Sequence, residues 1–120
     1  MAQRSLVWIG SSKKDLMAFP DEVRGVMGYA LWLAQTGGKH QDAKPLQGFG
    51  GAGVVEVVDD YDGDTYRTVY TLTFADTIYV LHAFQKKSKH GAATPKQDVD
   101  LIRRRLRRAE ELHASGLPRP

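Results

Sequence analysis

The chain of 120 residues contains no cysteine. This absence excludes a disulfide framework, a thiolate nucleophile and a zinc site with sulfur ligands, and it favours a reducing cytoplasm. Long apolar runs are also missing. The uncharged stretch around residues 26–36 is too short to cross a bilayer, and the amino terminus lacks the pattern of a signal peptide. We therefore expect a cytoplasmic protein that does not enter a membrane.

The net charge is small, but the charged residues are unevenly distributed along the chain. The formal net charge is +3, whereas from His82 onward ten Lys and Arg stand against four Asp and Glu. Because Lys and Arg bind phosphates, a basic carboxy-terminal third favours a polyanionic partner. A solvated helix face explains the same charges equally well.

The length suits one domain, which we place over residues 1–115, followed by a frayed tail over residues 116–120. Hydrophobic spacing predicts an α+β fold: an antiparallel sheet with a meander, a helical hairpin before it and a helix after it. We expect a strand at 6–9, helices at 13–19 and 20–36, a loop at 39–53, strands at 54–59, 65–74 and 78–87, and a helix from 94 to about 113.

Two helix starts carry the spacing of a capping box. Ser12 precedes Asp15 by three residues, and Thr94 precedes Gln97 by three residues with Pro95 between them. A serine or threonine hydroxyl at such a position accepts a backbone N–H of the first turn. We therefore expect Ser12 and Thr94 to cap the helices that follow them.

Two short motifs resemble ligand sites without their context. Gly48–Gly53 matches GxGxxG, but a strand-like segment follows it where a dinucleotide site needs a helix. The turn Asp60–Asp64 resembles a calcium loop, but its glycine is misplaced and no glutamate closes it. We expect no cofactor and no metal.

Three segments together resemble one protein family. Lys44–Gly48 followed by Val55–Val57 resembles its K-x-L-x-G and W-E-[LI] entry into the sheet, and Tyr66–Tyr70 resembles its Y-R-x-x-Y strand. Leu81–Ser88 resembles its L-H-x-F-x-K-K-[ST] strand, the most specific of the three. The chain is thus similar, over most of its length, to the HigB-like, phage-derived branch of the RelE/ParE toxin superfamily, and the resemblance implies the RelE-like fold.

The resemblance implies a ribosome-dependent endoribonuclease that cuts mRNA in the 30S A site, with a helix-turn-helix antitoxin as its partner. The 2′-hydroxyl would attack the neighbouring phosphate without a metal. Arg67 matches the residue that clamps this phosphate, Lys86 and Lys87 match a lysine pair that binds phosphate or acts as a base, and Tyr70 is a weaker candidate for proton transfer. Further RNA contacts are expected from Lys44, Lys89, His90 and Arg104.

Structural roles remain open for several of these residues. Arg67 has Glu56 or Asp59 within reach across the predicted hairpin, and Tyr70 shares strand parity with core positions. Strand alternation places Lys86 and Lys87 on opposite faces. His82 shares parity with Val80 and Phe84, which favours a packed, hydrogen-bonded histidine. Val58 stands where the family often has an arginine.

Two other functions are compatible with the resemblance. A toxin of the same fold acts on DNA gyrase without cleaving RNA, as the ParE branch does. A degenerate member would only bind its antitoxin or RNA. The Lys86-Lys87 motif belongs to the ribonuclease side of the superfamily and favours RNA cleavage.

Overall fold

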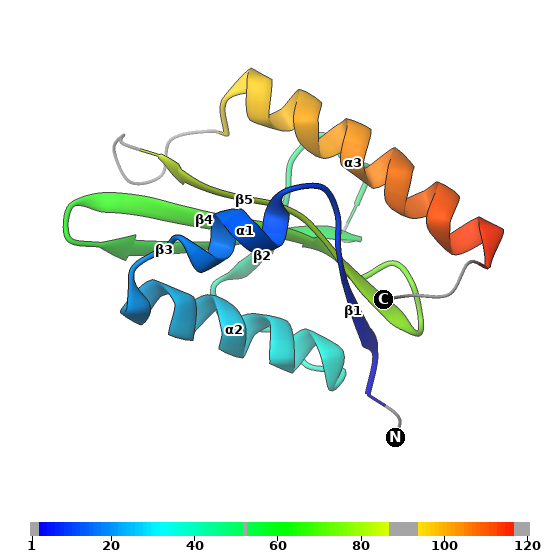
Figure 1. The fold of residues 1–120 in the computed structure, drawn as a ribbon, viewed down its shortest axis with the longest axis horizontal. Helices are drawn as coiled ribbons and strands as arrows, with labels where there is room; N and C mark the ends of the chain where they lie inside the picture. Colours follow the sequence, from blue (N-terminus) through cyan, green and yellow to red (C-terminus); the bar gives the residue numbers. More distant parts are fainter. Residues whose placement is uncertain (1–2, 52, 87–93, 117–120) are drawn as a thin grey trace.

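The computed structural model describes residues 3–51, 53–86 and 94–116. Its five-stranded sheet lies between two helices on one face and a long helix on the other (Figure 1). The predicted α+β class, with two helices before the meander and one after it, is confirmed. In chain order the elements are β1 (Ser5–Trp8), α1 (Ser12–Met17), α2 (Asp21–Gln35), β2 (Ala43–Pro45), β3 (Val54–Tyr61), β4 (Asp64–Thr71), β5 (Thr77–Lys86) and α3 (Lys96–Ser115).

The strands lie in the order β1-β5-β4-β3-β2. The predicted meander is confirmed, because β3, β4 and β5 pair antiparallel to one another in sequence. β1 runs parallel to β5 at one edge, and β2 pairs antiparallel to β3 at the other. β2 lies in a segment that we expected to be a loop. Its three residues, one of them Pro45, are too few to show an alternating pattern.

The turn between β3 and β4 consists of Asp62 and Gly63, which have φ values of 52° and 85°. Two consecutive residues with positive φ form the type I′ turn, whose twist matches that of the flanking strands. The surrounding aspartates therefore belong to a plain hairpin, as expected, and both strands extend closer to the turn than the sequence indicated.

α1 and α2 pack on one face of the sheet, and the apolar core lies beneath them. The apolar residues that recur every three or four positions along α2 are buried except for Val26, which is half-buried. Tyr66 and Tyr70 of β4 belong to this core, with Phe19 meeting Tyr66 edge to face. α2 contributes Val23, Met27, Ala30, Leu31 and Ala34.

α3 covers the opposite face, which we call the α3 face. Only Ile102 and Ala109 of this helix are fully buried, while Leu106 and Leu112 are partly buried. These side chains pack in an apolar cluster on this face, which also includes Val69, Tyr79 and Leu81. Gly116 ends α3 in the left-handed conformation, with φ of 68°.

Both predicted capping boxes are wrong, because a tertiary contact takes each hydroxyl. The Ser12 hydroxyl donates to the Val80 carbonyl oxygen at 3.1 Å. The Thr94 hydroxyl donates to the Glu56 carboxylate at 3.0 Å, and Pro95 stands at the N-cap without a side-chain hydrogen bond. The start of α3 is thereby fastened to β3.

A β-bulge interrupts the pairing of β4 with β5. Val69 lies opposite His82 and Tyr70 lies opposite Val80, so Leu81 is the extra residue. The expectation that His82 shares a face with Val80 is therefore wrong. His82 and the alternate residues after it lie on the α3 face, whereas Val80 lies in the core under α2.

Candidate functional site

Arg67 and Lys86 lie on the same face of the sheet. Arg67 contacts Thr94, just before α3, and is paired in register with Phe84. Thr65, two residues before Arg67, is paired in register with Lys86. Because paired residues project to the same side of a sheet, both cations belong to the α3 face.

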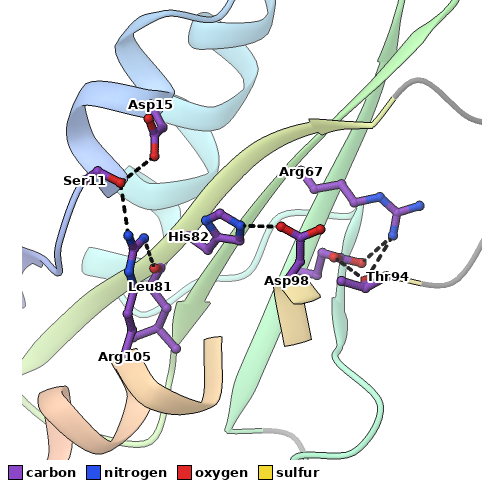
Figure 2. A network of polar contacts seen from close by, with 9 residues as sticks. Ser11, Asp15, Arg67, Leu81, His82, Thr94, Asp98 and Arg105 are labelled. Atoms are coloured by element: carbon purple, nitrogen blue, oxygen red, sulfur yellow. Dashed lines mark hydrogen bonds and ion pairs between the residues drawn. The ribbon is translucent and has the colours of Figure 1, made fainter. Parts of the chain in front are cut away.

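Arg67 is buried in an ion pair. Arg67 as a whole residue is 4% exposed. Its Nη1 donates to Oε1 of Glu56 at 3.1 Å and to Oγ1 of Thr94 at 3.3 Å. Thr94 closes the triangle by donating to the other Glu56 oxygen (Figure 2). The structural alternative in which Arg67 pairs with Glu56 across the hairpin is confirmed, whereas Asp59 is paired in register with Tyr66.

This pairing sets the condition for anion binding at Arg67. The Arg67 side chain is 5% exposed and the Glu56 side chain 11% exposed. A guanidinium can serve several acceptors through its five N–H groups. A phosphate would therefore have to share Arg67 with the Glu56 carboxylate or displace that carboxylate.

His82 and Asp98 form a second pair beside the first. His82 Nε2 lies 2.8 Å from Asp98 Oδ1 (Figure 2). The imidazole stacks on Phe84, with 4.5 Å between the ring centroids. His82 is 6% exposed. The expectation of a packed, hydrogen-bonded histidine is confirmed, although its partner comes from α3. The first turn of α3 is thus tied to β5 as well as to β3.

The position of Tyr70 contradicts its predicted role in proton transfer. Tyr70 is 0% exposed and lies in the core under α1 and α2, on the opposite face from Arg67. Burial raises the pKa of its phenol to about 12, and its hydroxyl has no hydrogen-bond partner among the described residues. Such a group reaches no substrate on the α3 face.

The other expected RNA contacts are spread over several elements. Lys44 is exposed on edge strand β2 and is paired in register with Glu56, so it also faces the α3 side. Arg104 is exposed on α3. Lys86, at the end of β5, is half-buried. Lys87, Lys89 and His90 lie outside the described residues.

Sequence reasoning missed the part that Arg105 plays in this region. Its Nη1 donates to the Leu81 carbonyl oxygen at 2.9 Å, and its Nη2 donates to the Ser11 hydroxyl at 3.0 Å. Burial lowers the pKa of Arg105. The only sequence signal was an arginine within the otherwise outward-facing basic run of α3, next to apolar Leu106.

A cavity of about 500 Å³ adjoins His82 and Phe84 from the side of α1, and Asp15, Tyr66 and Gln85 also line it.

Within residues 3–51, 53–86 and 94–116, no three His, Cys, Asp or Glu side chains are grouped as a metal site. No helix in the part of the chain that the structure describes is long and apolar enough to cross a membrane.

Comparisons with known proteins find one matching family and distant similarity to solved structures. The family model described as "Phage derived protein Gp49-like (DUF891)" matches residues 14–107. No curated protein matches the chain. The crystal structure of the toxin–antitoxin complex RelBE2 from Mycobacterium tuberculosis is similar with a TM-score of 0.46 and 16% identity, over 73% of this chain and 97% of that chain.

Proposed function

Because the chain belongs to the phage-derived Gp49-like family, whose model matches residues 14–107, we propose that it is a toxin that cleaves messenger RNA on the ribosome. This family is the phage-derived branch that the motifs indicated. The proposal is carried by one observation beyond the family: the α3 face joins Arg67 of β4 and Lys86 of β5, which come from two different motifs.

The proposed reaction is an attack of the 2′-hydroxyl on the adjacent phosphorus. The bond to the 5′-oxygen breaks and this oxygen takes up a proton from water, which leaves a 2′,3′-cyclic phosphate and a 5′-hydroxyl. Arg67 would bind the non-bridging phosphate oxygens through its planar fork, which suits a phosphate better than a point charge does. Lys86 or Lys87 would neutralise the developing charge, and one of them would take the proton from the 2′-hydroxyl.

RNA outside the scissile phosphate would be held by further cations. We assign this role to Lys44, Lys89, His90 and Arg104, of which Lys44 and Arg104 are exposed in the structure. An exposed lysine or arginine gives affinity without sequence preference, because it contacts the phosphate backbone. The likeness of the motifs to HigB-like toxins supports a small helix-turn-helix antitoxin as the partner.

Primer extension on mRNA from cells that express the protein tests the proposal. We expect discrete cuts within translated frames. Gyrase-dependent DNA damage with intact mRNA would instead establish the ParE-like alternative. If neither mRNA cuts nor DNA damage is observed, the protein is a member that only binds its antitoxin or RNA.

The matched variants are Arg67→Lys and Arg24→Lys. Arg67→Lys keeps the charge next to Glu56 but loses the fork, so we expect cleavage to fall by about a hundredfold, the scale of a displaced catalytic contact. Arg24 pairs with Asp21 on the surface of α2, so Arg24→Lys should cleave as the wild type does. Equal cleavage by wild type and Arg67→Lys would remove Arg67 from the proposed site.

A further inference from the structure

The bulge in β5 decides which residues of that strand join Arg67. After Leu81, the residues His82, Phe84 and Lys86 lie on the α3 face, while Ala83 lies in the core on the other side. Without the extra residue the alternation would reverse, because a shift of one position turns every side chain to the other face. Lys86 would then lie on the side opposite Arg67.

One guanidinium holds the extra residue. Arg105 of α3 donates from Nη1 to the carbonyl oxygen of Leu81 and from Nη2 to the hydroxyl of Ser11, at 2.9 Å and 3.0 Å. Ser11 in turn donates to Asp15 of α1 at 2.7 Å. Figure 2 shows Arg105 between the Leu81 carbonyl and the Ser11–Asp15 pair. Leu81, which has no partner in register on β4, is thus tied to α3 and to the start of α1.

The turn before α1 is shaped to admit this guanidinium. Gly10 has φ of +57°, and a Cβ built on it would lie 2.8 to 2.9 Å from three guanidinium atoms of Arg105. Any larger residue would have to push Arg105 away. The neighbouring carbonyl of Val80 is served separately, by the Ile9 amide and the Ser12 hydroxyl. Arg105 therefore has a defined place at the bulge.

We propose that Arg105 is a positioning residue for RNA cleavage, which it supports by fixing the Leu81 bulge so that Phe84 and Lys86 stay on the face of Arg67. The predicted effect of Arg105 on RNA cleavage rests on the proposed function. The predicted effect of Arg105 on the register between β4 and β5 does not. Arg105 itself does not touch the substrate.

The test compares Arg105→Met with Arg103→Met. Arg103 also fastens α3 to a neighbouring segment, through the Gly48 carbonyl at 2.8 Å and the Phe49 ring at 4.5 Å, but it does not contact the bulge. Both variants lose one charge and two contacts between α3 and the rest of the fold. We expect Arg105→Met to lower cleavage by about a hundredfold, as for a displaced catalytic group, and Arg103→Met to retain it. Equal losses would overturn the proposal.

Binding of an uncleavable RNA, with a 2′-deoxy nucleotide at the cut site, separates positioning from general loosening. Arg105→Met should raise Kd about tenfold, the effect of one lost charge-assisted contact. In a Lys86→Met background the same substitution should change Kd little, because the contact that it misplaces is already gone. An undiminished effect in that background would contradict a role through Lys86.

Nuclear magnetic resonance decides the register without RNA. In the wild type we expect a cross-strand contact between the α-protons of Val69 and His82, and in Arg105→Met its weakening or replacement. If Arg105→Met does not fold, Arg105→Lys takes its place, since a single ammonium lacks the fork that serves Leu81 and Ser11 together. An unchanged register overturns the inference. Absence of cleavage by the wild type would overturn the proposed function alone.

Discussion

At the scale of single residues, the Arg67–Glu56 pair dominates the α3 face. A buried ion pair adds little net stability over an apolar replacement, but removing one partner leaves an uncompensated charge. As whole residues, Arg67 is 4% exposed and Glu56 is 8% exposed. A simple alanine substitution of Arg67 therefore tests folding and function together, and a conservative substitution is the better probe of function.

A double-mutant cycle tests the pair. We expect Glu56→Ala and Arg67→Ala each to lower the free energy of unfolding by about 3 kcal/mol or more, and the double variant to lose clearly less than the sum. Urea unfolding followed by circular dichroism gives the three values. Purely additive losses would mean that the two groups do not stabilise each other.

Tyr70 gives a prediction about alkaline pH. Its pKa is raised from 10.0 to about 12 by burial, so the folded state retains the phenolic proton more strongly than the unfolded state does. This contribution to stability is complete below pH 10 and is lost as the pH rises through about 12. The Tyr70→Phe variant should lose less stability than the wild type over that interval, as measured by urea unfolding. An identical pH profile would show that Tyr70 ionises freely in the folded state.

At the scale of elements, the sequence predicts what depends on local periodicity. The buried stripe of α2, the meander and the last helix were all visible in the spacing of apolar residues. β2 was not, since it is three residues long and forms only because β3 offers it an edge. The sequence also could not reveal the bulge, because Leu81 and His82 continue an unbroken apolar and aromatic strand pattern.

The candidate site was subject to the same limit, because sequence patterns predict only local structure. Sequence motifs selected Arg67 and Lys86, which do share a face, but a strict alternation from Val80 to Lys86 would have separated them. The Thr94 hydroxyl was assigned to a cap because the capping box is a local pattern, whereas its partner Glu56 lies 38 residues away. Contacts across such separations depend on the packing of α3, which periodicity does not encode.

Thr94 gives the prediction at this scale. Thr94→Val keeps the shape of the side chain but removes the hydroxyl that joins Glu56 and Arg67 to the start of α3. We expect a loss of about 1 kcal/mol and faster hydrogen exchange in the first turn of α3. Thr94→Ser, which retains the hydroxyl, should exchange as the wild type does. Unchanged exchange in Thr94→Val would mean that the apolar contacts of α3 hold its first turn.

At the scale of the whole molecule, the sheet separates two kinds of surface. Under α1 and α2 lies one apolar cluster, which includes Tyr70. Under α3 lie a second apolar cluster and the two ion pairs, with Lys86 at the end of the same strand face. The basic carboxy-terminal third thus provides both α3 and the end of β5. The charge asymmetry seen in the sequence corresponds to one side of the fold, where we place the RNA.

The most direct measurement uses ribosomes stalled with a defined codon in the A site and two matched mRNAs. One mRNA is entirely ribose, and the other carries a single 2′-deoxy nucleotide at the mapped cut. Our account predicts that the purified protein cuts the first, leaving a 2′,3′-cyclic phosphate and a 5′-hydroxyl, and leaves the second intact at that position. Equal cutting of both mRNAs, or of neither, would contradict it.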